Sequence, residues 1–451
     1  TMREKRTVQS SLFERYAEHD IGQELKAMSE WLDAHTDLLD WVAADVNSRN
    51  VEETGRKGLS VESVLRCAIL KQYRQLSYEE LVFCLMDSAS CQAFARVTAG
   101  WSPKKATLQQ SISAISDVTW EQINLRLLGS AKDSKVEKGE MLRIDSTVTD
   151  SPIHEPSDST LLWDSVRVLV RLLKEAEALV GAPGVIGYHN HQRVAKKRVR
   201  AIRYTRGVEN KARLYKDLID VTRKTLKYVE QASVALVSCG QADSPSYLVW
   251  QAQVDHYKGL ILKVIDQTER RVLRGEKVAA GDKIVSLFEE HTDIIVKGRR
   301  DIQYGHKLNL STGRSGLILD VVVEAGNPAD ADRFVPMLER HIDNYAKAPR
   351  QMAADGGYAS GENLREAKAL QVEDVVFHKK RGLKVEEMAK SPWVYRKLRN
   401  FRAGIEAGIS CMKRAYGLGR CTWKGLAHFK AYVWSAVVAH NLALFGRLKP
   451  A

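Results

Sequence analysis

Apolar positions in the first part of the chain recur at helical spacing. Residues 60–73 have apolar side chains three or four positions apart, which is typical of a helix with a buried face. A second helix is expected from Ser77, where Ser-Tyr-Glu-Glu has the capping-box spacing in front of an apolar run. A third is expected near Thr107. The pattern predicts an all-helical N-terminal region over residues 1–136.

Two lysines, Lys104 and Lys105, stand just before the third of these helices. A helix N-terminus flanked by lysines can bind DNA phosphates, because free backbone N–H groups and ammonium charges both attract anions. An ordinary helical bundle with a basic corner fits the same pattern. We therefore interpret the region as a helix-turn-helix-like DNA-binding or dimerisation region, and the plain bundle remains the alternative.

The pattern changes to strict alternation after this region. Leu142, Ile144 and Ser146 alternate with Arg143, Asp145 and Thr147, which predicts a strand containing Asp145. Pro152 and Pro156 then interrupt any regular element. We assign residues 137–157 to a catalytic domain that continues at 291–451 after a long interruption.

The second part of this domain predicts a mixture of strands and helices. A glycine-containing turn joins two of its strands into a hairpin, and helices separate the later strands. Strands are expected at 293–297, 303–310, 317–323, 350–355 and 374–378, and helices at 327–345, from 360, 393–416 and 426–448. An antiparallel hairpin joined to parallel strands with crossover helices predicts an α+β or α/β fold with an RNase H-like mixed sheet.

The interruption, residues 158–290, returns to helical spacing and is rich in charge. From Arg193 to Asp217 it holds ten Lys or Arg residues against two acidic ones. So dense a run of one sign repels itself unless an anion neutralises it, which favours contact with a DNA backbone. The candidate contacts are Lys196, Lys197, Arg198 and Arg200. A solvated helix face is the alternative, and the insertion could instead serve mainly in dimerisation.

Composition narrows the class of protein and of partner. The 451 residues carry a net charge of +13, which predicts salt-sensitive attraction to a polyanion such as DNA. No apolar run reaches membrane-spanning length, and the N-terminal residues do not resemble a signal peptide. Six scattered cysteines form no metal-binding pair, so we expect a reduced, cytoplasmic setting, associated with the nucleoid when DNA is bound.

Three carboxylates stand in contexts that suit metal ligands. Asp145 lies in the predicted strand, Asp355 ends another strand before Gly-Gly, and Glu406 lies in a predicted helix. Hard carboxylate oxygens on rigid elements are what a two-metal phosphoryl-transfer site needs. Each residue alone would be weak evidence, because an aspartate at a strand end is most often a turn residue. Together, in a basic chain, they predict a site for two Mg²⁺ ions, with Mn²⁺ able to substitute.

Basic side chains share the helix face of Glu406. Arg399, Arg402 and Lys413 lie at offsets of −7, −4 and +7 from it, so they fall near one face. They can bind the phosphates of the DNA that is cut, and a cation beside Glu406 keeps that carboxylate ionised. A surface helix with an ordinary ion pair is the alternative interpretation.

Two further DNA contacts are candidates. Lys307 lies on a predicted strand, where it suits a phosphate contact better than its neighbour His306, which points to the opposite face and is expected to be structural. Trp423 follows the Glu406 helix and could stack on an unpaired base. A tryptophan in the hydrophobic core is at least as good an explanation.

These motifs resemble the DDE transposases of bacterial insertion sequences, of the ISNCY type. The resemblance covers nearly the whole chain, beginning with Gln9-Ser-Ser-Leu-Phe-Glu. Arg143-Ile-Asp-Ser-Thr and Ala354-Asp-Gly-Gly-Tyr resemble the two aspartate motifs, and the segment from Arg402 through Glu406 to Lys413 resembles the family's Arg-Glu-Lys signature. Arg399 stands where that signature has a tyrosine.

The resemblance implies an activity and partners. It implies a homodimer that binds terminal inverted repeats, cleaves the DNA ends with Mg²⁺ and joins 3′-hydroxyls to target DNA. Asp145, Asp355 and Glu406 would be its catalytic metal ligands. Two alternatives stay open: a nuclease of the same fold that cuts without joining, and a transposase-derived DNA-binding protein without catalysis.

Overall fold

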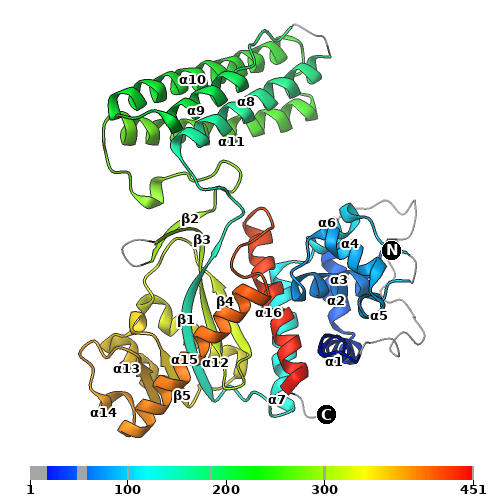
Figure 1. The fold of residues 1–451 in the computed structure, drawn as a ribbon, viewed down its shortest axis with the longest axis vertical. Coiled ribbons are helices and arrows are strands. Elements are labelled where there is room, and N and C mark those ends of the chain that lie inside the picture. The colour runs from blue at the N-terminus through cyan, green and yellow to red at the C-terminus, as the bar shows by residue number, and fades with distance from the viewer. Residues whose placement is uncertain (1–17, 48–57, 99–100, 182–184, 298–300, 449–451) are drawn as a thin grey trace. The chain divides into compact units, whose positions relative to one another are not determined.

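The computed structural model describes residues 18–47, 58–98, 101–181, 185–297 and 301–448 (Figure 1). The chain forms two compact units, one made of Thr1–Pro152 with Gly305–Ala451 and the other of Ile153–Tyr304. Within the described ranges, no helix combines the length and hydrophobicity needed to cross a membrane. The sequence motif at residues 9–14 lies outside the described residues.

The N-terminal region is helical, as its apolar spacing predicts. Ser60 and Ser77 both act as N-caps, and Ser77 forms the expected capping box with Glu80. The third predicted helix begins at Lys105, two residues before Thr107. The helices are α1 (Asp20–Ala34), α2 (Leu38–Asn47), α3 (Val61–Tyr73), α4 (Tyr78–Asp87), α5 (Ala89–Ala95), α6 (Lys105–Ile112) and α7 (Asp117–Asp133).

A mixed sheet forms the centre of this unit, and the residues of its strands between 293 and 304 belong to the second unit. Its six strands follow the order β2-β3-β1-β5-β6, and β4 also pairs with β3. β1 is antiparallel to β3 and parallel to β5, so it joins the hairpin half of the sheet to the parallel half (Figure 1). The strands are β1 (Met141–Asp150), β2 (Asp293–Lys297), β3 (Asp301–Thr312), β4 (Ile318–Val323), β5 (Gln351–Ala354) and β6 (Asp374–Phe377). All six lie where the sequence pattern predicts strands.

Helices from the C-terminal part pack on this sheet. They are α12 (Phe334–Tyr345), α13 (Gly361–Ala369), α14 (Val385–Met388), α15 (Pro392–Ala415) and α16 (Leu426–Leu448). The helix expected from residue 327 instead begins at Phe334, after a short 3-10 turn. The short helix α14 lies between β6 and α15, where no helix was expected. α15 packs on β1, β5 and β6, which brings its residues to the centre of the sheet.

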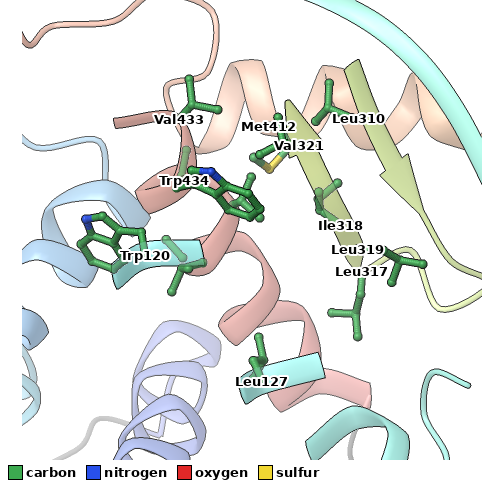
Figure 2. Close-up of a cluster of buried hydrophobic side chains, with 14 of the residues drawn as sticks. Trp120, Leu127, Leu310, Leu317, Ile318, Leu319, Val321, Met412, Val433 and Trp434 are labelled. Atoms are coloured by element: carbon green, nitrogen blue, oxygen red, sulfur yellow. The ribbon is translucent and has the colours of Figure 1, made fainter. Parts of the chain in front are cut away.

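The N-terminal helices share one core with the sheet through α16. That helix contacts α1, α3 and α7 as well as β4, and it is buried along most of its length. Asn441 of α16 accepts a hydrogen bond from Ile318 N at 2.9 Å and donates one to Asn124 of α7 at 2.7 Å. Figure 2 shows the apolar surroundings of this junction, with labelled side chains from α7, α15, α16, β3 and β4. The helical region is therefore built onto the sheet rather than tethered to it.

The second unit is helical, as predicted for the insertion. Four helices, α8 (Asp158–Val180), α9 (Gln192–Tyr204), α10 (Val208–Ser238) and α11 (Pro245–Thr268), surround a hydrophobic core of their own. Trp250 of α11 donates its indole N–H to the Leu172 carbonyl of α8 at 2.9 Å. A short π-helical turn, Glu269–Leu273, follows α11.

Candidate active site

The register of two parallel strands places Asp145 beside Asp355. Ile144 of β1 pairs with Ala354 of β5, and each aspartate is the next residue along its own strand. Asp145 also pairs with Leu310 of β3. Both aspartates therefore stand at one edge of the β1–β5 pair, although 210 positions separate them in the sequence.

Glu406 approaches the same edge from α15, together with Arg402 one turn before it. The Arg402 guanidinium contacts all three carboxylates. Its Nη2 lies 3.1 Å from Asp145 Oδ2 and 3.3 Å from Asp355 Oδ1, and its Nη1 lies 2.6 Å from Glu406 Oε1. The three carboxylates singled out in the sequence thus converge on one cation.

Exposure differs sharply among the three. The Asp145 side chain is 14% exposed, that of Asp355 38% and that of Glu406 60%. Burial raises the pKa of Asp145, the positive charge of Arg402 opposes this rise, and the negative charges of Asp355 and Glu406 add to it. Arg402 is therefore the group that offsets the mutual repulsion of three neighbouring carboxylates.

The donor set suits a divalent metal ion, but its present geometry is organised around the guanidinium. Carboxylate oxygens are the ligands that Mg²⁺ and Mn²⁺ prefer. In the described part of the chain, no three His, Cys, Asp or Glu side chains are spaced to hold a metal ion directly. The guanidinium stands in for a cation among these oxygens. The three carboxylates suit a metal ion by their chemistry, and Arg402 would have to release them before a metal ion could bind there.

A residue that the sequence analysis did not select fixes α15 against β1. The Arg143 guanidinium donates from Nη1 to the Phe401 carbonyl at 2.7 Å and from Nε to Thr312 Oγ1 at 2.6 Å. A Cβ at Gly404 would lie 2.1 Å from Arg143 Nη1, so α15 can approach only because residue 404 has no side chain. A buried arginine within a strand was the signal that could have identified it.

We expect Gly404→Ala to destabilise the protein while Gly408→Ala stabilises it. Both residues lie in α15, but nothing lies within 4 Å of a Cβ built at Gly408. Alanine there gains about 0.5–1 kcal/mol of helix propensity. At Gly404 the displacement of Arg143 outweighs that gain, so the free energy of unfolding should fall by about 1–2 kcal/mol. Thermal unfolding of the two variants measures the difference, and equal stabilisation of both would contradict this packing.

The two glycines after Asp355 are explained by packing. A Cβ at Gly356 would lie 2.6 Å from Lys379 Cβ, and one at Gly357 would lie 2.5 Å from Asp330 Oδ2. The following Tyr358 is buried and donates its hydroxyl to Asn309 Oδ1 at 2.6 Å. The tight turn therefore orients Asp355, and close contact with DNA is not needed to explain these glycines.

Two predicted DNA contacts are wrong. Lys307 is 8% exposed; its Nζ lies 2.6 Å from Asp330 Oδ1 and donates to the Pro328 carbonyl at 2.7 Å, so it is an internal ion pair. Trp423 is 7% exposed, and its ring meets that of Tyr432 edge to face at 5.7 Å, so it belongs to the core. Burial removes both side chains from any DNA surface.

The other basic candidates of this unit differ in accessibility. Lys104 and Arg399 are exposed. Lys105 is also exposed but is already paired with Glu79. Lys413 is half-buried near Asp150; burial raises the pKa of that carboxyl, and the charge of Lys413 opposes the rise. Lys104, Lys105, Arg399 and Lys413 therefore remain candidate DNA contacts.

In the insertion, the predicted basic cluster lies on α9. Lys197 and Arg200 are exposed, and so is Lys196, whose Nζ lies 5.8 Å from the centre of the Trp163 ring. Arg198 differs because its Nε lies 2.6 Å from Asp217 Oδ2 of α10. Three of the four side chains are therefore available to a polyanion, while the fourth holds two helices together.

Comparison with known proteins finds a similarity over part of the chain. Residues 297–442 match the family model described as a transposase DDE domain. The match covers the elements that carry Asp355 and Glu406, and Asp145 precedes it. Neither a curated protein nor a solved structure matches the chain. Residues 297–442 of this chain are therefore similar to a transposase DDE domain, and they include the part of the mixed sheet where Asp355 and Glu406 meet Asp145.

Proposed function

We propose that the protein binds the terminal inverted repeats of its own insertion sequence, cleaves the DNA ends and joins the 3′-hydroxyl ends to target DNA. The observation that carries the proposal is the convergence of Asp145, Asp355 and Glu406 on one guanidinium. Phosphoryl transfer on DNA needs concentrated negative ligands for metal ions, and this arrangement supplies them.

In this proposal Asp145, Asp355 and Glu406 hold two divalent ions, Mg²⁺ or Mn²⁺. Such ions polarise the scissile phosphate, lower the pKa of the attacking water and stabilise the leaving oxygen. The half-buried Asp145 is the most rigid of the three ligands, since it lies within β1 and between β3 and β5. Arg402, once released from the carboxylates, can donate to a phosphate of the bound strand with the bidentate geometry that guanidinium favours.

The basic chain supports DNA as the partner, and the need to hold two transposon ends together supports a homodimer. The exposed side chains Lys104, Arg399, Lys196, Lys197 and Arg200 are the proposed backbone contacts, with Arg402 and Lys413 nearer the cut. Contacts to phosphate fix position and contribute salt-dependent affinity without reading sequence.

A strand-transfer assay tests the function. The protein is incubated with Mg²⁺, a plasmid target and a duplex carrying the sequences that flank its own gene, beside an Asp145→Ala variant. Nicked ends and joined products seen only with wild type and metal support the proposal. Nicked ends without joined products indicate a cleavage-only nuclease. Metal-independent binding without any product indicates a DNA-binding protein that has lost catalysis.

Neutralising the exposed cluster of α9 is expected to flatten the salt dependence of DNA binding. A Lys196→Gln, Lys197→Gln, Arg200→Gln variant should lower the slope of log affinity against log salt by up to about three units, close to one per lost phosphate contact. The control removes three exposed charges that are not clustered, Lys174, Lys227 and Lys263. An equal change in both variants would exclude α9 as the contact surface.

A further inference from the structure

A cleft of about 720 Å³ opens in the first unit, beside the helix that carries Glu406. Its walls are the end of α3, the start of α4 and the loop that follows α15. Among its lining residues are Lys71, Tyr78, Lys105, Lys413, Arg420 and Tyr432. The volume lies in the range of sites that bind small ligands, and the lining is more basic than such sites usually are.

Hydrogen bonds fix α3 to the end of α15 along this cleft. Gln72 Nε2 donates to the Tyr416 carbonyl and Gln75 Nε2 to the Arg414 carbonyl, both at 2.6 Å. The Tyr432 hydroxyl donates to the Gly417 carbonyl at 2.9 Å. The cleft is therefore rigidly attached to the C-terminal end of the Glu406 helix.

Lys71 is the unusual group of the cleft. It is 6% exposed, and no carboxylate of the described residues lies within ion-pair distance of its Nζ. Its contact there is the ring of Tyr78, whose centre lies 4.8 Å from Nζ. Burial lowers the pKa of Lys71 to about 8, with Cys421 and Glu80 opposing the shift. A buried ammonium without a paired anion costs stability, and in a cleft it indicates a ligand-binding role.

The acidic residues of the cleft already have partners. Glu79 is paired with Lys105. Glu80 accepts the Ser77 backbone N–H at 2.7 Å as part of the α4 capping box. Burial raises the pKa of the nearby Asp150, and the positive charges of Lys413 and Arg420 oppose that rise. Lys413 and Arg420 thus share one carboxylate, and Lys71 is attracted by Glu80 without forming an ion pair among the described residues.

We propose that this cleft binds a backbone phosphate of the DNA strand that enters the active site, with Lys71 as the principal ligand. The proposal rests on the proposed function. Lys413 lines the cleft and follows Glu406 by seven residues on α15, which is about 10 Å along a helix. The cleft therefore borders α15 about two turns beyond Glu406.

The test compares Lys71→Met and Lys71→Arg in the full-length protein, by fluorescence anisotropy with the flanking-sequence duplex. Lys71→Met should bind about tenfold or more weakly, as expected for one lost charge-assisted hydrogen bond. Its salt slope should fall by about 0.9, the value for one phosphate. Lys71→Arg should retain most of the affinity. Lys26→Met, which removes an exposed lysine of α1 outside the cleft, is the matched control.

The pH dependence gives an independent readout. Because the Lys71 charge is present below about pH 8 and lost above it, wild-type affinity should fall from pH 7 to pH 9. Lys71→Met and Lys71→Arg should not show that fall. The other titratable groups around Lys71 are Tyr78, Glu80, Lys413, Cys421 and Tyr432. Every variant retains these groups. The difference in the pH dependence of DNA affinity between wild type and variant is therefore assigned to Lys71.

Each outcome decides between the proposals. Lys71→Met should fold, because it removes a buried charge and should raise the melting temperature at pH 7. Wild-type affinity and slope in this folded variant would overturn the cleft proposal and leave strand transfer untouched. A thermal shift shows whether wild type binds inorganic phosphate or a mononucleotide through Lys71. If it does, and if DNA affinity does not depend on Lys71, the cleft binds a free anion. That result would overturn the assignment of the cleft to DNA.

Discussion

Asp355→Asn and Glu406→Gln are each expected to lower strand cleavage by about 10³-fold or more while DNA affinity changes little. Each substitution keeps the shape of the side chain and removes the charge on which metal binding depends. The loss of a group that stabilises developing charge in the transition state is worth about 10²–10³-fold by itself, and loss of a metal ion adds to that. Binding relies on basic side chains elsewhere, so it should persist.

Glu362→Gln is the matched control for this prediction. Glu362 is an exposed carboxylate of α13 that lies outside the carboxylate cluster, so its replacement should leave both cleavage and binding unchanged. Cleavage rates under single-turnover conditions, with anisotropy measured in parallel on the same duplex, separate chemistry from binding. A loss of affinity as large as the loss of cleavage would show that these carboxylates shape the DNA surface instead of the reaction.

Much of the site could be predicted because its elements carry strong local signals. Alternation identified the strand of Asp145, the glycine turn identified the strand end at Asp355, and helical spacing identified the helix of Glu406. Their convergence could not be read locally. It depends on the register in which Ile144 meets Ala354, and that register is set by packing between segments separated by the whole insertion.

The errors have a common physical cause. The prediction for Lys307 assumed that a strand has one solvent-facing side, as in a half-covered sheet. β3 is an interior strand in which both His306 and Lys307 are buried, so alternation no longer separates inside from outside. Trp423 is a similar case: a loop position suggested exposure, but α16 packs beside it through Tyr432. Burial by distant elements was the missing information in each case.

Arg402 is the residue whose contacts in the structure differ most from its predicted role. The sequence places it beside Glu406 as a phosphate contact, whereas its guanidinium also reaches both aspartates. A cation in this position neutralises the carboxylates before metal binds. In the proposed function, divalent ions compete with Arg402 for the same oxygens, and we propose that a DNA phosphate which receives the guanidinium favours metal binding.

We therefore expect Arg402→Gln to bind metal more tightly than wild type in the absence of DNA, while strand transfer is lost. Removing the competing guanidinium should lower the Mn²⁺ concentration needed for half-maximal thermal stabilisation by about tenfold, the equivalent of one charge-assisted hydrogen bond. In metal-free buffer the same variant should melt below wild type, because three carboxylates then face one another without a counter-charge. Arg399→Gln, on the same helix but exposed, should change neither quantity. A weaker response to Mn²⁺ in Arg402→Gln would mean that the guanidinium organises the carboxylates for metal instead of competing with it.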